Sequence, residues 1–262
     1  MKITIFTSND LRHINLINKI SNISTRCFAI VEGKTIFPGR VDDFFKKTKL
    51  MKKYFVNVKK AEKKFFFKNR FINKNVNCKF IKQGDLNFLS KNDISEALNS
   101  DVYIVFGSSY IKGWLINFLI KKKAINIHMG LSPYYRGSSC NFWALQDNNP
   151  HLVGATIHYL SKGLDSGKII YHVLPDKKFN NIFEYTMSVV KNAHTLLAKK
   201  IKDKSIFKVK SYKQNYKLEK KYTKNIDFND KALQIFFEKN ITINYIKKNI
   251  KNKFDKNKFI NT

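Results

Sequence analysis

Two uninterrupted apolar runs constrain the fold of this chain more than any other feature. Residues 27–31 (CFAIV) and 102–106 (VYIVF) are apolar throughout and have the length of a β-strand. A strand that is apolar on both faces belongs in a sheet covered by helices on both sides. Residues 2–7 alternate apolar and polar positions, and residues 11–20 follow with helical spacing. This strand, helix, strand opening predicts an α/β protein with a Rossmann-like, open and mostly parallel twisted sheet.

The remaining periodicities extend this plan. Further strands are predicted at 78–81, 124–128, 154–160 and 168–174, and helices at 93–98, 114–122 and 181–204. Because the connection between the last two strands is short, we expect them to form an antiparallel pair. Residues 42–70 predict one long amphipathic helix or two shorter ones, with a core-facing stripe as the ordinary interpretation and a membrane-surface helix as the alternative. We expect a main domain over residues 1–205 and a small basic C-terminal extension of uncertain order over 206–262.

The formal net charge of +31 raises the question of a nucleic-acid partner. Only 5 of the 50 basic residues are arginine, whose planar guanidinium is the preferred group for binding phosphates and bases. The lysines accompany abundant Asn, Ile and Phe, as an AT-rich coding bias would produce. A solvated lysine surface is therefore the ordinary interpretation, and a basic nucleic-acid-binding module is the non-enzyme alternative. In either case anionic substrates should be attracted over long range, and salt should weaken the attraction.

Cysteine usage and hydropathy indicate the compartment. Cys27, Cys78 and Cys140 are widely spaced and form no Cys-x-x-Cys pair, so neither a disulfide framework nor a zinc ribbon is predicted. No apolar run approaches the roughly 18 residues needed to cross a bilayer, and the opening residues are too polar for a signal peptide. We expect a cytoplasmic protein with three free thiols and no membrane partner.

Polar side chains of three chemical kinds follow the predicted strands. Asn126 and His128 are two residues apart and therefore share one face of a strand, near its carboxyl end. The loop 133–137 (PYYRG) follows, and Asp165 lies in a Ser-Gly turn between two later strands. Each has an ordinary structural interpretation on its own. Together they place an amide, an imidazole and a carboxylate where two loops could converge, which indicates chemistry on a small carbonyl group.

The ordered set of motifs resembles the formyltransferases that use 10-formyltetrahydrofolate, a family that includes the glycinamide ribonucleotide, methionyl-tRNA and sugar-nucleotide formyltransferases. The motifs are Asn-x-His at 126–128, Pro-Tyr-Tyr-Arg-Gly at 133–137, an apolar helix with Trp143, Gly-x-Thr-x-His at 154–158 and Gly-x-Asp-x-Gly at 163–167. The resemblance covers roughly residues 1–205 and is densest over 102–170. Many members have Pro-Ser after the catalytic His, whereas this chain has Met129 and Gly130.

The resemblance implies a catalytic set of Asn126, His128 and Asp165. An amine attacks the formyl carbon, and Asn126 would donate a hydrogen bond to the formyl oxygen as negative charge develops there. His128, if protonated, would donate more strongly. Asp165 would hold His128 in its cationic form and help to take the proton that leaves the amine, directly or through water. No metal is required for this chemistry.

The resemblance also implies binding residues. The pterin ring of 10-formyltetrahydrofolate would lie in a slot lined largely by main chain, from Phe106, Gly107, Ser108, Tyr110, Ile111, Gly163, Leu164 and Gly167. For Phe106 and Ile111, core packing is an equally good interpretation. The candidates for binding the acceptor are Ser8, Asn9, Arg12, Tyr135, Arg136 and Gly137, with a surface position as the alternative for Arg136.

Three amine acceptors compete. The loop after the first strand has no glycine, unlike the phosphate loop of glycinamide ribonucleotide enzymes. The region after Lys204 is short for the C-terminal barrel of methionyl-tRNA enzymes, although the basic charge keeps tRNA open as a partner. The sequence therefore favours an anionic small molecule, an amino sugar carried on a nucleoside diphosphate, and it leaves a homodimer open.

Overall fold

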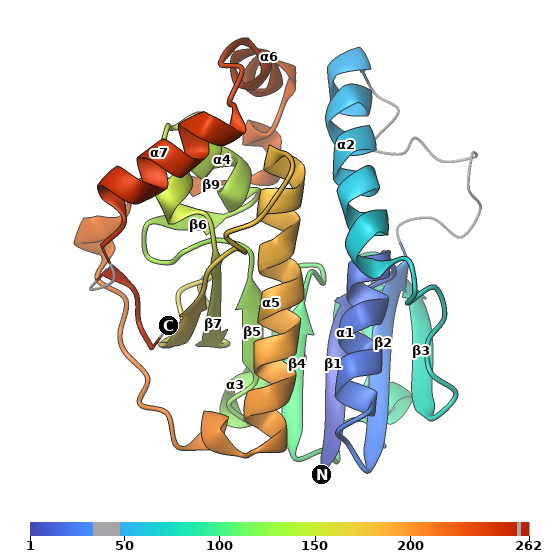
Figure 1. Ribbon diagram of the computed structural model, residues 1–262. Coiled ribbons are helices and arrows are strands. Elements are labelled where there is room, and N and C mark those ends of the chain that lie inside the picture. Colours follow the sequence, from blue (N-terminus) through green and yellow to red (C-terminus); the bar gives the residue numbers. More distant parts are fainter. Residues whose placement is uncertain (34–47, 256–257, 262) are drawn as a thin grey trace.

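A seven-stranded sheet organises the protein, whose computed structural model describes residues 1–33, 48–255 and 258–261 (Figure 1). In spatial order the strands are β3 (Val76–Lys82), β2 (Arg26–Gly33), β1 (Lys2–Ser8), β4 (Val102–Phe106), β5 (Ile125–His128), β7 (Ala155–Tyr159) and β8 (Ile169–Val173). The first five are parallel, β7 is antiparallel to β5, and β8 is antiparallel to β7. The predicted α/β fold, including its antiparallel pair, is confirmed.

Helices cover both faces of the sheet, as the uninterrupted apolar strands predicted. α1 (Leu11–Ser21), α2 (Lys49–Phe66) and α5 (Ile182–Lys202) lie over one face, and α3 (Gly113–Lys121) lies behind the other (Figure 1). Neighbouring side chains of one strand enter different apolar clusters: Ile5 packs into the cluster with α1 and α5, and Phe6 packs into the cluster with α3. This alternation follows from the two-residue period of a strand.

One or two helices were predicted over residues 42–70. The structure describes residues 48–70 of this region, and they contain one helix, α2, which begins at Lys49. The Thr48 hydroxyl accepts a hydrogen bond from the amide of Met51 at 3.1 Å, which caps the helix. Met51, Ala61 and Phe66 are buried in the main core, so the core-facing interpretation holds. The short helix expected at 93–98 is only a 3-10 turn, Asn92–Ile94.

A small second sheet was not predicted. β6 (Tyr135–Gly137) pairs in parallel with β9 (Lys221–Thr223), and α4 (Cys140–Gln146) follows β6. Gly137 has a φ of +89°, and a Cβ atom there would lie 1.9 Å from the carbonyl oxygen of Thr223. Only glycine permits this close approach of the two strands.

The C-terminal extension is ordered in its described part. α6 (Asp230–Glu238) and α7 (Ile243–Lys253) lie beyond the carboxyl ends of the parallel strands (Figure 1). Phe228, Phe236 and Ile246 are buried in the same apolar cluster as the sheet. The boundary at residue 205 stays a prediction, but the extension shares its core with the main domain.

Replacing Phe228 by alanine tests that shared core. The ring lies 4.8 Å from the ring of Phe142 and 5.2 Å from that of Tyr54, between centroids. We expect the free energy of unfolding to fall by about 3–5 kcal/mol, the usual range for a buried Phe. Ile226→Ala, two residues away at a position that is 80% exposed, is the control and should change it little. Urea unfolding of the two variants would measure both values, and equal effects would contradict the shared core.

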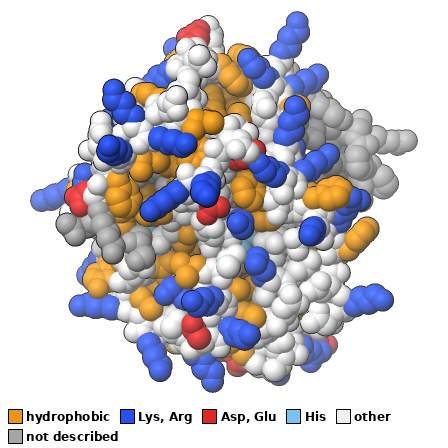
Figure 2. Space-filling model, in the orientation of Figure 1, with side chains coloured by type: hydrophobic (Ala, Val, Ile, Leu, Met, Phe, Trp, Pro, Cys, Tyr) orange, Lys and Arg blue, Asp and Glu red, His pale blue; other side chains and the backbone are white. Residues whose placement is uncertain are grey.

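Lysine and arginine side chains are scattered over the visible face of the molecule rather than gathered in one strip (Figure 2). On this face, the distribution fits a solvated lysine surface better than a continuous basic strip that would bind nucleic acid. Within the described ranges, no helix is both long enough and apolar enough to cross a bilayer.

Candidate active site

The three predicted catalytic side chains lie together at the carboxyl edge of the sheet. β5 ends at His128, and two residues earlier it presents Asn126 on the same face. Asp165 lies between β7 and β8 with a left-handed backbone, φ +47°. Its carboxylate is 3.2 Å from Nδ1 of His128 and accepts a hydrogen bond of 3.3 Å from the amide of Asn126. The predicted convergence of an amide, an imidazole and a carboxylate is therefore present in the structure.

Asp165 is held as a carboxylate although it is almost buried. Burial would raise its pKa, but His128, His158 and the backbone amide of Gly137 outweigh burial and lower the pKa to about 2. The Gly137 amide donates to Oδ2 at 3.2 Å. At neutral pH this side chain is thus a fixed negative charge beside the imidazole.

His128 faces oxygen atoms with both ring nitrogens. Nδ1 faces Asp165, and Nε2 lies 3.1 Å from the carbonyl oxygen of Tyr135. Burial lowers the pKa of His128 below its ordinary value, and the Asp165 carboxylate opposes that effect. A neutral imidazole has one N–H, so it can donate to only one of the two oxygens. The second nitrogen can be satisfied only by gaining a proton or a new partner.

His158 lies beside Asn126 and Asp165, and no role had been predicted for it. Its Nε2 lies 2.9 Å from the amide nitrogen of Asn126 and 3.7 Å from Oδ1 of Asp165. Nδ1 lies 2.8 Å from the carbonyl oxygen of Tyr159, so the ring donates there and accepts from Asn126. The Gly-x-Thr-x-His motif at 154–158 ends at this residue and could have indicated it as a site residue. The alternation along β7 places His158 opposite Asn126 in register.

One cavity of about 620 Å³ opens beside Asn126, His128 and Asp165. Of the predicted cofactor-binding residues it is lined by Phe106, Gly107, Ser108, Tyr110, Ile111, Gly163 and Leu164. The Tyr110 hydroxyl donates to the carbonyl of Lys162 at 2.6 Å, which joins the two loops that form the walls. Among the predicted set only Gly167 lies outside this lining. A Cβ atom on Gly167 would lie 1.6 Å from the Tyr159 carbonyl, so the glycine lets the Asp165 loop pass close to β7.

A second cavity, of about 300 Å³, lies on another side of His128. His128, Met129 and Gly137 line both cavities. Aromatic side chains from separate elements, Tyr54, Phe55, Phe142 and Phe228, form much of its wall. Phe228 belongs to the C-terminal extension. None of these four had been predicted as a site residue: Tyr54, Phe55 and Phe142 lie on helices, where aromatic residues are ordinarily core, and Phe228 lies in the extension, where no periodic pattern was visible.

The predicted acceptor-binding residues are divided by the structure. Arg12 and Gly137 line the 300 Å³ cavity. Within the described ranges, Ser8, Asn9, Tyr135 and Arg136 line neither cavity beside His128. Arg136 instead donates to Glu219 at 2.7 Å and to the Leu164 carbonyl at 3.1 Å, so it ties β6 to the extension and to the Asp165 loop. Binding roles for these residues stay predictions, and this ion pair does not favour one for Arg136.

The cations beside the 300 Å³ cavity are already neutralised. Arg12 pairs with Asp10 and Glu62, both at 2.8 Å, and Lys59 contacts the same two carboxylates. Two positive charges thus face two negative ones, and the Glu62 side chain is fully buried. Little net charge is left here to attract an anion.

Gly130 provides a test of how tightly His128 is held. A Cβ atom at this position would lie 2.5 Å from Nε2 of His128 and 2.5 Å from Cβ of Cys140. We expect Gly130→Ala to lower the free energy of unfolding by about 1–3 kcal/mol. By displacing the imidazole it should lower activity by about a hundredfold. Gly33→Ala is the matched control, because the nearest atoms to its Cβ would be 3.8 Å away. Equal activity in the two variants would show that His128 has room to move.

In the part of the chain that the structure describes, no group of three or more His, Cys, Asp or Glu side chains is arranged to hold a metal ion. The arrangement instead offers an amide donor, an imidazole and a fixed carboxylate between two cavities. That set can polarise a carbonyl group and move a proton.

Part of the chain is similar in sequence to known proteins. Residues 90–201 match the formyl transferase family. Over 90 residues, 34% of this chain, the sequence is 33% identical to the methionyl-tRNA formyltransferase of Clostridioides difficile (strain 630). The matched segments span about a quarter of the length of the curated relatives.

Solved structures share the fold. The N-formyltransferase from Helicobacter canadensis, solved with folinic acid and dTDP-3-aminofucose, aligns over 94% of this chain and 82% of its own, at 15% identity and a TM-score of 0.53. The phosphoribosylglycinamide formyltransferase of Anaplasma phagocytophilum aligns over 80% of this chain and 89% of its own, at 17% identity and a TM-score of 0.52.

Proposed function

Because the chain belongs to the formyl transferase family through residues 90–201, we propose that it transfers a formyl group from 10-formyltetrahydrofolate to a primary amine. The observation that carries the proposal is the position of His128. Its imidazole, with Met129 and Gly137, lines both the 620 Å³ and the 300 Å³ cavity. A donor in one cavity and an amine in the other would meet beside the Asp165 carboxylate. We call the two the donor cavity and the acceptor cavity.

The donor cavity fits a folate. Its volume is within the range of about 300–1,000 Å³ that is usual for small-molecule sites. Main chain of residues 106–111 and of the Asp165 loop offers N–H and C=O groups for a ring edge, and Val105, Ile116 and Leu160 offer apolar surface. Lys224, from the extension, also lines the cavity and provides a cation for a carboxylate. 10-Formyltetrahydrofolate supplies the formyl carbon and regains a proton on its nitrogen when the formyl group leaves.

Four side chains have separate roles in the proposed reaction. The Asn126 amide donates to His158 and to Asp165. When the donor binds, Asn126 gives up its longer, 3.3 Å hydrogen bond to Asp165, and that N–H donates to the formyl oxygen as negative charge grows there. Neutral His128 directs its Nδ1–H at Asp165, which leaves the lone pair of Nε2 to accept the proton that the attacking amine loses. Asp165 stabilises the imidazolium so formed, which then gives this proton to the folate nitrogen as the bond to the formyl carbon breaks. His158 positions Asn126 and Asp165.

An amino sugar carried on a nucleotide is the acceptor we favour. The acceptor cavity has an aromatic wall suited to a sugar or base ring. The similar Helicobacter fold was solved with a nucleotide-linked amino sugar. Methionyl-tRNA is the second candidate, because the curated sequence match is to an enzyme with that substrate.

We further propose that residues 1–205 form the catalytic domain and that the enzyme works in the cytoplasm, where its three free cysteines stay reduced.

An activity screen tests the proposal. The protein is incubated with 10-formyltetrahydrofolate and, separately, with amino-sugar nucleotides, glycinamide ribonucleotide or charged initiator tRNA. We expect tetrahydrofolate and a formylated acceptor, identified by mass spectrometry, with one class only. If every acceptor is left unmodified although folinic acid binds, the transferase function is rejected.

A further inference from the structure

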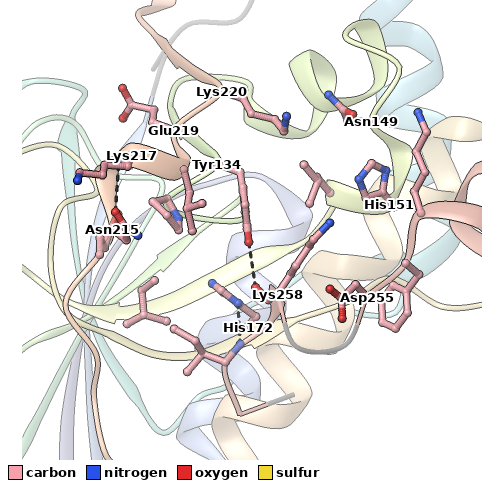
Figure 3. Close-up of a pocket in the computed structure, with 18 of the residues that line it drawn as sticks. Tyr134, Asn149, His151, His172, Asn215, Lys217, Glu219, Lys220, Asp255 and Lys258 are labelled. Carbon is pink, nitrogen blue, oxygen red and sulfur yellow. Dashed lines mark hydrogen bonds between the residues drawn. The ribbon is translucent and has the colours of Figure 1, made fainter.

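The largest of the three cavities is separate from the catalytic group. It measures about 980 Å³ and lies between β8 and the C-terminal extension (Figure 3). It shares no lining residue with the donor or the acceptor cavity. The proposed reaction therefore makes no use of it.

Positive charge converges on this cavity. Five lysines line it, against two carboxylates, Glu219 and Asp255. Glu219 is paired with Arg136 at 2.7 Å, which is not part of the lining. Among the described residues, none of the five lysines forms an ion pair. The lysines are Lys213, Lys217, Lys220, Lys253 and Lys258. Their uncompensated charge attracts an anion.

His151 adds a buried polar side chain to the lining of the cavity. The residue is only 8% exposed, and its Nδ1 is buried with no hydrogen-bond partner in the described structure. Leaving such an atom unsatisfied destabilises the folded protein, and a ligand that supplies the partner removes this cost. Burial and then Lys253 and Lys258 lower the pKa of His151 to about 4, so lysines from separate segments act on this ring. His172, across the cavity, differs because Nε2 donates to the Ser132 carbonyl and Nδ1 accepts from the Ile260 amide.

Gln214, which also lines the cavity, has an acceptor atom without a partner among the described residues. Its amide nitrogen donates to the carbonyls of Asp165 and Gly167 at 2.7 and 2.8 Å, which identifies the other atom as the oxygen. That Oε1 is buried and has no partner in the described residues. A phosphate carries no donor at neutral pH, whereas a hydroxyl or amino group does. Tyr134 and Phe254 add ring surface.

We propose that this cavity binds a nucleotide, with its phosphates against the lysines and His151 and with a hydroxyl or amino group donating to Gln214. The lysines would bind the phosphates, and Gln214 would accept a hydrogen bond from a hydroxyl or amino group. The rings of Tyr134 and Phe254 would pack against the base. A nucleotide fits better than a nucleic-acid strand, because the two unsatisfied atoms lie buried in one cavity rather than along the surface. The proposal does not depend on the formyl transfer reaction.

Calorimetric titration of the full chain with ADP tests this site. Lys253→Glu with Lys258→Glu should weaken ADP binding at least about tenfold, because two attractive charges become repulsive. Lys247→Glu with Lys251→Glu is the matched control: it makes the same change of net charge on exposed positions of α7 outside the cavity. Binding by the control should stay within about twofold of the wild-type value, since salt screens distant charges.

A second variant separates the site from general electrostatics. His151→Phe keeps a ring but removes both nitrogens, and it should weaken ADP binding by about tenfold through the lost hydrogen bond. Inorganic pyrophosphate should bind more weakly than ADP. Absence of ADP binding, equal losses in the two double variants, or binding of a single-stranded oligonucleotide in place of ADP would overturn the proposal.

Discussion

Replacing His128 by asparagine should lower the rate of formyl transfer by about a thousandfold while the protein still folds and still binds folinic acid. A positioned acid–base group contributes about 10²–10⁴ to a rate. Asparagine keeps polarity at the end of β5 but cannot accept the proton of the amine. The loss should appear in kcat, because the imidazole acts on the reacting atoms rather than on the body of either substrate.

His128→Gln is a useful companion, since its amide extends one bond further toward both cavities. This variant should be as inactive as His128→Asn, because neither amide acts as an acid or a base near neutral pH. Steady-state kinetics, with urea unfolding to confirm the fold, would measure both variants. Transfer at the wild-type rate in either one would reject the assigned role of His128.

Asp165→Asn should be the second most damaging change, lowering activity by about a thousandfold. The carboxylate accepts from the Gly137 amide and from Asn126, and it faces Nδ1 of His128. An amide of the same size would turn an N–H toward at least one of these donors. Asparagine tolerates the left-handed backbone of residue 165, so the loop itself should persist. We also expect the free energy of unfolding to fall by about 1–3 kcal/mol, because at least one buried donor would lose its acceptor.

The same variant makes a prediction about pH. The folded pKa of Asp165 is about 2, below the ordinary value of 3.8. A lowered folded pKa stabilises the protein above the unfolded pKa, and this contribution disappears as the pH falls through the folded pKa. Asp165 should therefore lose about 2 kcal/mol of stabilisation between roughly pH 4 and pH 2. Urea unfolding at pH 6 and pH 2 should show the gap between wild type and Asp165→Asn narrowing; a constant gap would contradict the buried carboxylate.

Local sequence patterns predicted the sheet, and they predicted that Asn126 and His128 lie together, for physical reasons. The apolar runs at 27–31 and 102–106 favour strands in a sheet that helices cover on both faces. Asn126 and His128 share a face because successive side chains of a strand point to opposite faces. Asp165 was placed only through the order of motifs. Its contact with His128 joins β5 to the β7–β8 loop, a distance along the chain that no local pattern encodes.

What the sequence could not predict depends on tertiary contacts. The pairing of β6 with β9 links residues far apart in the chain, and each strand is too short to show a period. Arg136 looked like a ligand for an anion, but its partner Glu219 lies in the extension, where no periodic signal was visible. The aromatic wall of the acceptor cavity was hidden for the same reason, since Tyr54 and Phe228 meet only when α2 and the extension pack together.

The position of His128 between donor and acceptor is most directly tested by NMR of protein labelled with ¹⁵N-histidine and titrated with folinic acid. His128→Asn would identify the signals of His128 among those of the six histidines. As the donor cavity fills, the ring nitrogens of His128 should shift, while those of His151, which lines the separate 980 Å³ cavity, should stay unchanged. Saturable binding of folinic acid that leaves the His128 nitrogens unmoved would contradict the account.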